Sequence, residues 1–189
     1  MEENRKGIRI DKKGKISFMI KKIFVGIDNG TSGTITIISG KTIDHFPTPI
    51  TTALSYTKTK QKISRINHQE LERRLPKGNV YCLLERPMIN PLRWKASMSA
   101  IRALEATLII LERLNIPYEY IDSKEWQKYF LPKSPPLKKG EKKTKQQKDA
   151  EKRALKTDAI DIAKRLFPMI KTKDADSILI AEYARRKRL

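Results

Sequence analysis

The chain has 189 residues, enough for one domain with a substantial hydrophobic core but too few for two full domains. It carries 41 Lys and Arg against 21 Asp and Glu, a formal net charge of +20. So many positive charges repel one another unless a polyanion neutralises them. Nucleic acid is therefore the first partner to consider and a membrane surface the second. No apolar run is long enough to span a bilayer, and a single cysteine excludes an internal disulfide framework. These features favour a cytoplasmic protein.

The first half of the chain predicts a run of short strands. Residues 1–21 are polar and basic, and we expect a flexible tail there, followed by one domain over residues 22–189. Apolar, β-rich stretches at 22–28, 33–39 and 41–46, joined by tight turns, predict an antiparallel meander. Residues 47–64 are rich in Thr and Lys and predict a loop. A helix is expected over 67–75, and a buried strand that includes Cys82 over 80–85.

The second half alternates helices and strands. Residues 96–114 predict an amphipathic helix, 116–121 a strand, and the next helix, which holds Trp126, has a cap at Asp122 or Ser123. Residues 131–150, rich in lysine and with three prolines, predict a flexible basic loop. Helices are expected over 152–168 and 175–189. The order predicts an α/β fold whose mixed five-stranded sheet, an antiparallel meander plus parallel strands, is flanked by helices.

Four acids stand where predicted elements end or begin. Asp28 ends the first strand, in the stretch VGIDNGTSG, and Glu85 ends the strand 80–85, while Asp174 and Asp176 open the last helix. Each acid alone has a structural alternative, because strand-end acids bond to loop amides and helix-start acids act as caps. Together they have the chemistry to hold two Mg²⁺ ions, which take oxygen ligands and in pairs promote attack of water on a phosphodiester.

Four stretches carry a resemblance to a known family. FVGIDNGTSGTITI, LLERPMIN, KTDAIDIAKRLFP and DADSILIAEYARR occur in this order between residues 22 and 187. They resemble the RNase H-like nucleases, specifically the RuvC-type Holliday-junction resolvases and most closely their small phage-borne members. The resemblance implies an RNase H-like fold and a homodimer that binds four-way or branched DNA. It also implies symmetric nicking with Mg²⁺ or Mn²⁺, which leaves 5′-phosphate and 3′-hydroxyl ends.

The resemblance also assigns roles to residues of this chain. Asp28, Glu85 and Asp176 match the metal ligands. The family's further ligand, about three residues before the helix acid, falls on Lys173, so either Asp174 takes this role or the site runs on three acids. Lys156 matches a basic position that faces the scissile phosphate, and an ordinary solvated helix face is its alternative.

Other residues are candidates for contacts with DNA. They follow the first two acids or lie in the basic loop, and they are Gly30, Thr31, Ser32, Arg86, Arg93, Lys138, Lys139, Lys142, Lys143 and Lys145. Gly30 and Gly33 are expected to supply positive φ or room for DNA to approach. Trp94 either stacks on a base or packs in the fold, and we favour packing. The helix 96–114 is expected to form the dimer seam or to pack on the sheet, and the two histidines, His45 and His68, are expected at the surface.

Other classes of function stay open. GIDNGTSG also resembles the first phosphate loop of sugar kinases and other actin-like ATPases, which have two such domains and a second Gly-rich loop. This chain has eight glycines and no second cluster of them. A non-catalytic nucleic-acid-binding protein is a further alternative, and it would need no Mg²⁺ at the acids. Within the nucleases, enzymes that cut RNA–DNA hybrids also remain.

Overall fold

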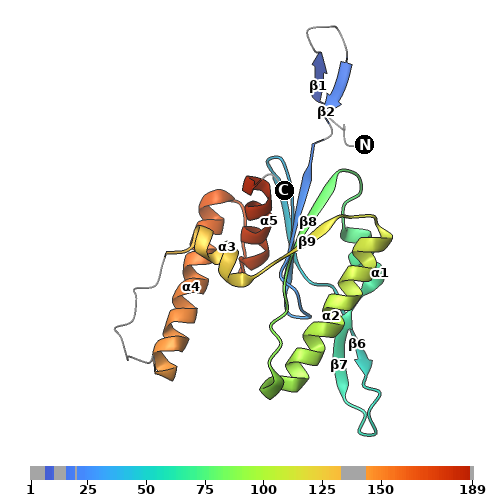
Figure 1. Cartoon of the computed structure of the whole chain (residues 1–189), viewed down its shortest axis with the longest axis vertical. Helices are drawn as coiled ribbons and strands as arrows, with labels where there is room; N and C mark the ends of the chain where they lie inside the picture. The colour runs from blue at the N-terminus through green and yellow to red at the C-terminus, as the bar shows by residue number, and fades with distance from the viewer. Residues whose placement is uncertain (1–6, 11–15, 20, 133–143, 188–189) are drawn as a thin grey trace.

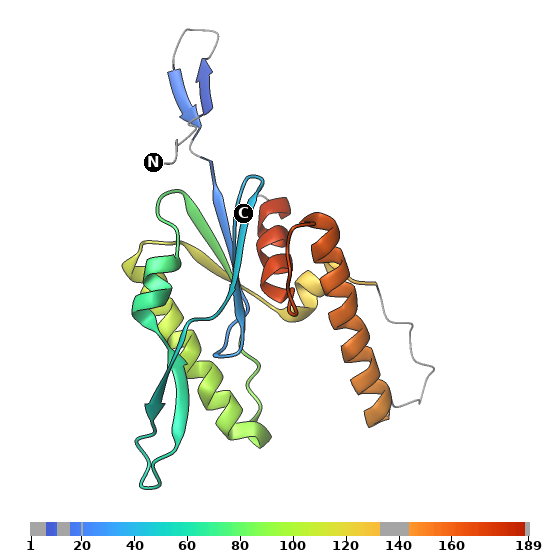
Figure 2. The same cartoon turned by 180° about the vertical axis from the view of Figure 1, so that it is seen from behind.

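A computed structural model describes residues 7–10, 16–19, 21–132 and 144–187 (Figures 1 and 2). At its centre is a five-stranded sheet of order β5-β4-β3-β8-β9. Its strands are β3 (Ile23–Ile27), β4 (Thr34–Ser39), β5 (Thr42–Pro47), β8 (Val80–Glu85) and β9 (Tyr118–Ile121). β3, β4 and β5 pair antiparallel, whereas β8 lies parallel to both β3 and β9. The predicted α/β fold, with the mixed sheet that the RNase H-like resemblance implied, is therefore confirmed.

Helices cover both faces of this sheet. Figure 2 shows α1 and α2 on one side and α3, α4 and α5 on the other. Their bounds are α1 (His68–Arg74), α2 (Trp94–Arg113), α3 (Ser123–Phe130), α4 (Lys145–Leu166) and α5 (Asp176–Lys187), with a short 3₁₀ helix η1 (Pro91–Arg93) before α2. None of the helices in the described ranges combines the length and the apolarity needed to cross a membrane.

The alternation of side chains along β3 and β8 decides which way the strand-end acids face. Phe24 and Tyr81 belong to the core cluster that includes α4 and α5, whereas Val25 and Cys82 belong to the cluster on the α1–α2 side. Successive side chains of a strand point to opposite faces of a sheet. The even-numbered residues of β3 and the odd-numbered residues of β8 therefore face α5. The acids that continue these two rows are Asp28 and Glu85.

Helix α5 packs directly on β3 because one residue of that strand has no side chain. A Cβ atom at Gly26 would collide with the backbone of Ser177 and Ala181 in α5. Residues 177–184 of this helix are all buried. The close contact brings the first turn of α5 beside the end of β3, which positions the site described below.

Two predictions about local structure are wrong. The segment 47–64, predicted as a loop, contains β6 (Ile50–Leu54), which pairs antiparallel with β7 (Lys62–Ile66). The strands were missed because most of their side chains are exposed, so no buried alternation marks them. Helix α4 begins at Lys145 rather than 152, because Thr144 and Gln147 form a reciprocal capping box that starts the helix inside the predicted flexible loop.

The segment 1–21, predicted as a flexible tail, contains two short strands. β1 (Gly7–Ile10) pairs antiparallel with β2 (Ile16–Met19). The mobility of this segment stays a prediction. The predicted DNA-contacting residues Lys138, Lys139, Lys142 and Lys143 lie outside the described residues.

Candidate metal centre

Three aspartates from two elements come together at the end of β3. Asp28 follows the last residue of this strand, Asp174 lies in the loop before α5, and Asp176 is the first residue of that helix. Each offers a carboxylate oxygen, and these oxygens all lie within 4.8 Å of one another. All three residues are partly buried. Carboxylate oxygens are the ligands that Mg²⁺ and Mn²⁺ prefer, so this donor set fits a hard divalent cation.

A tight loop after β3 fixes Asp28. The backbone amide of Asp28 donates to the carbonyl of Thr34 at 3.0 Å, and the amide of Gly33 donates to the carbonyl of Gly30 at 3.2 Å. Gly30 has a φ of +152°, which favours glycine, and a Cβ atom at Gly33 would collide with the carbonyl oxygen of Asp28. The expected positive φ is thus found at Gly30, whereas Gly33 makes room for the backbone of Asp28, and the expected room for DNA stays a prediction.

Hydrogen bonds to Thr172 hold the loop that carries Asp174. Thr172 Oγ1 accepts the backbone amide of Asp174 at 3.0 Å and donates to the carbonyl of the same residue at 2.5 Å. The Oδ1 atom of Asp174 accepts the amide of Asp176 at 3.1 Å, which ties the loop to the first residue of α5. The two aspartates are thus positioned as one unit.

Residue His45 supports Thr172 from the neighbouring strand β5. Its Nε2 atom lies 2.9 Å from Thr172 Oγ1, and its Nδ1 atom lies 2.9 Å from Thr36 Oγ1. Burial lowers the pKa of this histidine. The prediction that His45 is a surface residue is wrong, because its ring fills the space between β4 and the loop before α5. His68 is exposed, as predicted.

The carboxylates of the cluster lack enough positive charge around them. The pKa of Asp28 is raised to about 7. Burial is the largest cause, and the negative charges of Asp176 and Asp174 contribute to the same shift. Burial also raises the pKa of Asp176 to about 6, with Asp174 adding to the effect. Lys156 lowers the pKa of both, and its Nζ atom lies 3.9 Å from Asp174 Oδ2. A bound cation would supply the missing compensation.

Residue Glu85 lies beside this cluster but outside the group of three. The register pairs Ile27 with Leu84, so Glu85 and Asp28 end neighbouring strands. Burial raises the pKa of Glu85 to about 8, and the charge of Asp28 adds to this. Its Oε2 atom is buried and has no hydrogen-bond partner among the described residues. A buried carboxylate oxygen without a partner is costly, and a cation would satisfy it.

Trp126 of α3 is a neighbour of Glu85 that no sequence pattern connects with the site. Its indole N–H lowers the pKa of Glu85, but Nε1 is buried and forms no hydrogen bond within the described ranges. Asp122 occupies the N-cap position of α3, as expected, although its side chain makes no capping bond. Nothing in the spacing of Trp126 or His45 marks them as neighbours of the acids.

Several predicted DNA-contacting residues are exposed or partly exposed. Arg86 follows Glu85 and is 3.7 Å from Asp122. Arg93, Lys145 and Ser32 are exposed, whereas Gly30 and Thr31 are partly exposed. The packing favoured for Trp94 is wrong, because this side chain is 66% exposed at the start of α2.

The comparisons with known proteins give a match in structure only. No family model matches the chain, and no curated protein matches it. Solved structures of RuvC are similar to it. A structure of Thermus thermophilus RuvC matches 88% of this chain and 96% of its own, with 12% identity and a TM-score of 0.45. T. thermophilus RuvC in complex with a Holliday junction substrate matches over the same shares, with 10% identity and a TM-score of 0.49.

Proposed function

We propose that this protein is a metal-dependent endodeoxyribonuclease that cleaves four-way or otherwise branched DNA junctions. The observation that carries the proposal is the cluster of Asp28, Asp174 and Asp176, within 4.8 Å of one another. Beside it, Glu85 has a buried oxygen to which no described residue forms a hydrogen bond. A strongly basic chain, with net charge +20, suits a polyanionic substrate, and the acids suit the cations that hydrolysis of this substrate requires.

In this proposal the four acids hold two divalent ions, Mg²⁺ or Mn²⁺. When bound, such ions activate a water molecule and stabilise the leaving oxygen of the phosphodiester. The chain's own part is to hold the ligands in place. Asp28 is fixed by the loop after β3, and Asp174 and Asp176 by the start of α5. Because Asp28 and Asp176 have raised pKa values, metal binding displaces protons and strengthens as the pH rises through 6 to 8.

In this proposal, residues of the loops after β3 and β8, of α4 and of the basic segment before it would hold the DNA. Lys156, whose Nζ atom is next to Asp174, would lie against the scissile phosphate. The phosphate backbone would contact the residues named above, which are Gly30, Thr31, Ser32, Arg86, Arg93, Lys145 and the lysines at 138, 139, 142 and 143. Trp94 and the neighbouring Leu92, which is 94% exposed, offer apolar surface on which a base of an opened junction would stack.

A homodimer is part of this proposal, because symmetric nicking of a junction needs two sites. Helix α2 presents exposed apolar side chains on its outer surface, among them Ile101 at 40% and Ile109 at 48% exposure. Burying such a surface would stabilise a dimer. The oligomeric state in solution, measured by light scattering, tests this part separately from cleavage.

The experiment that tests the function compares wild type with Asp28→Asn. Both are incubated with a labelled four-way junction and with linear duplex, with and without Mg²⁺. We expect paired, symmetric nicks on the junction only with wild type and metal, and undiminished junction binding by the variant, because the substitution removes negative charge near the phosphates. Asp161→Asn, at an exposed position on α4, is the matched control and should cut like wild type.

Other results would support the alternatives. Binding of the junction without any metal-dependent cleavage would favour a non-catalytic nucleic-acid-binding protein. Indifference to DNA would favour the actin-like ATPase. Cleavage by Asp28→Asn at the wild-type rate would contradict the assignment of the site.

A further inference from the structure

The hairpin formed by β6 and β7, residues 50–66, extends away from the sheet at the edge that holds the metal centre (Figures 1 and 2). Its root is joined to the loop after Asp28, because the amide of Thr48 donates to the carbonyl of Gly33 at 2.9 Å. A second bond at 2.9 Å, from the amide of Asn67 to the carbonyl of Pro49, closes the root. The hairpin is therefore attached to the same loop that positions a proposed metal ligand.

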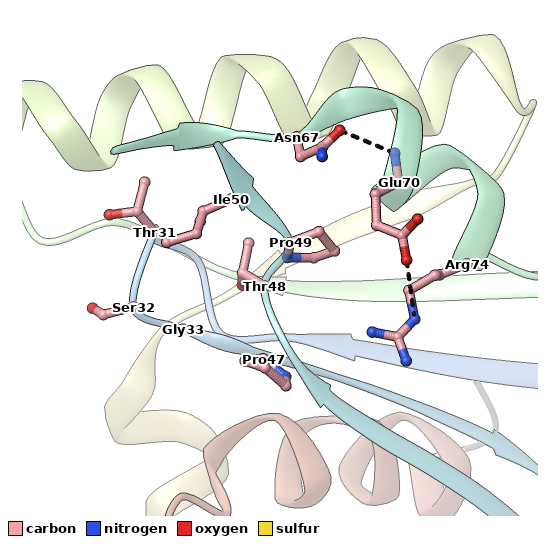
Figure 3. A pocket seen from close by; sticks show the side chains of 10 residues that line it. All are labelled: Thr31, Ser32, Gly33, Pro47, Thr48, Pro49, Ile50, Asn67, Glu70 and Arg74. Atoms are coloured by element: carbon pink, nitrogen blue, oxygen red, sulfur yellow. Dashed lines mark hydrogen bonds and ion pairs between the residues drawn. The ribbon is translucent and has the colours of Figure 1, made fainter. Parts of the chain in front are cut away.

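A hollow lies at this root, next to helix α1. It has a volume of about 440 Å³ and is lined by Thr31 and Ser32 of the loop, by Ile50 of β6 and by Arg74 of α1, among others (Figure 3). Arg74 is engaged there, because its guanidinium lies over the Phe46 ring and 4.0 Å from Glu70. The cationic groups available to a partner are thus those farther out on the hairpin.

Side-chain hydrogen bonds give the tip of the hairpin a defined shape. Ser55 Oγ lies 2.8 Å from Thr57 Oγ1, which donates to the carbonyl of Thr59 at 2.8 Å. The amide of Gln61 donates to Ser55 Oγ at 3.0 Å, and the amide of Ser55 donates back to the carbonyl of Gln61 at 2.8 Å. These bonds hold together the segment that carries the charges described next.

The hairpin concentrates positive charge without any acid. Residues 48–69 contain Lys58, Lys60, Lys62 and Arg65 and no Asp or Glu. All four cations are exposed, and none has an ion pair with another described residue. Tyr56, at the tip, is 84% exposed. Arg73 and Arg113 near the root are different, since both pair with glutamates of α1.

We propose that the β6–β7 hairpin is a DNA-binding arm that grips the phosphate backbone of a duplex lying across the metal centre. The inference rests on the proposed function, in which DNA is the substrate. Figure 2 shows the hairpin and the start of α4 projecting past this edge of the sheet on its two sides. Helix α4 begins with exposed Lys145 and Lys148. A duplex over the acids would therefore meet cations on both sides, and contacts of this kind add affinity without sequence readout.

The test compares two double variants that remove the same charge at different places. Lys58→Ala/Lys60→Ala changes the tip of the hairpin. Lys41→Ala/Lys77→Ala changes two exposed lysines in the turns before β5 and β8, at the opposite edge of the sheet. Each variant lowers the net charge from +20 by two to +18, so a general charge effect is the same in both.

Binding of a linear duplex and of a four-way junction is measured in chelator at a series of salt concentrations. Each phosphate contact contributes about 0.9 to the slope of log K against log salt. The hairpin variant should therefore show a slope shallower than that of wild type by up to about 1.8. The control variant should keep the slope of wild type. Equal slopes for the two variants would overturn the proposal.

Cleavage of the junction with Mg²⁺ is assayed in parallel, which separates the two proposals. A shallower slope for the hairpin variant, together with a wild type that never cuts, would retain the arm and refute the nuclease. Cutting by wild type with no difference in slope between the variants would retain the nuclease and refute the arm.

Discussion

At the scale of single residues, Thr172 holds the backbone of Asp174 in place beside the other acids. Its hydroxyl group accepts the amide of Asp174, donates to the carbonyl of Asp174 and contacts His45 Nε2. A hydroxyl group has one donor and two acceptor positions, so these three partners use its full capacity. Thr172 is thus a positioning residue, which acts on the metal only through Asp174.

Replacement of this hydroxyl group should weaken metal binding. In Thr172→Val the amide of Asp174 and Nε2 of His45 lose their partner, and leaving buried polar groups unsatisfied costs about 1–3 kcal/mol each. We expect the affinity for Mn²⁺, measured by titration calorimetry, to fall at least about tenfold, the equivalent of roughly 1.4 kcal/mol. Thr172→Ser keeps the hydroxyl group and should restore wild-type affinity. A valine variant that binds Mn²⁺ like wild type would show that Thr172 does not position Asp174.

At the scale of elements, the contact between β3 and α5 assembles the site. Gly26 allows α5 to approach, and a methyl group there would meet the helix backbone rather than a movable side chain. Gly26→Ala should therefore push α5 away from β3, reduce stability by about 3 kcal/mol through overpacking, and weaken Mn²⁺ binding because Asp176 moves relative to Asp28. Denaturant unfolding and Mn²⁺ titration measure the two effects.

A matched control for this substitution is Gly78→Ala. Gly78 has a φ of +104°, and a Cβ atom there would meet none of the described residues, so alanine brings backbone strain of about 1–2 kcal/mol without displacing another described element. It lies just before β8, at the edge away from the acids. We expect reduced stability with unchanged Mn²⁺ affinity. A parallel loss of affinity in both variants would mean that the effect of Gly26→Ala reflects general destabilisation.

The elements also explain what the sequence could predict. β3 and β8 are buried apolar runs, so their positions and the acids that end them followed from the pattern of residues. The β6–β7 hairpin did not, because Ile50 and Leu54 are exposed and its polar composition is that of a loop. The start of α4 depends on two residues, Thr144 and Gln147, which outweigh the lysine-rich composition around them.

The candidate site could likewise be predicted only in part from the sequence. Asp28 and Glu85 stand at the ends of adjacent parallel strands, and Asp174 and Asp176 stand just before and at the start of the last helix, so their grouping was open to prediction. That Glu85 falls outside the group within 4.8 Å depends on side-chain placement. His45 supports the site through contacts with Thr36, which lies on the neighbouring strand, and with Thr172, which is far from it in the sequence. No spacing in the sequence indicates these contacts.

At the scale of the whole molecule, positive charge predominates while the acids gather in one place. The net charge is +20, yet Asp28, Glu85 and Asp176 all have raised pKa values, of about 7, 8 and 6. Burial is the first cause in each, and the basic surface does not offset it. The fold therefore carries a local electrostatic cost that a bound cation would remove, so metal binding and stability are linked.

This linkage predicts a specific dependence of stability on pH in the absence of metal. A carboxyl group whose pKa is raised by folding binds more protons in the folded than in the unfolded chain at a pH between its two pKa values. For Asp28 these values are 3.8 and about 7. Its contribution to the free energy of unfolding is therefore most favourable below about pH 4 and is lost as the pH rises toward 7 and above. Asp28→Asn cannot lose a proton, so at pH 8 it should melt at a temperature at least about 3 °C above wild type, the shift produced by roughly 1 kcal/mol in a chain of this size.

The decisive quantity is the difference in melting temperature between the variant and wild type, because groups that do not interact with Asp28 titrate equally in both. It should be large at pH 8, small at pH 4, and reduced or reversed at pH 8 by excess Mg²⁺, since the ion stabilises only the protein that retains the carboxylate. Asp161→Asn, at its exposed position, should follow wild type throughout. A gap that does not change with pH would mean that Asp28 is ionised without cost in the folded chain. The cluster would then be satisfied without a cation, and the main physical argument for a metal centre would fail.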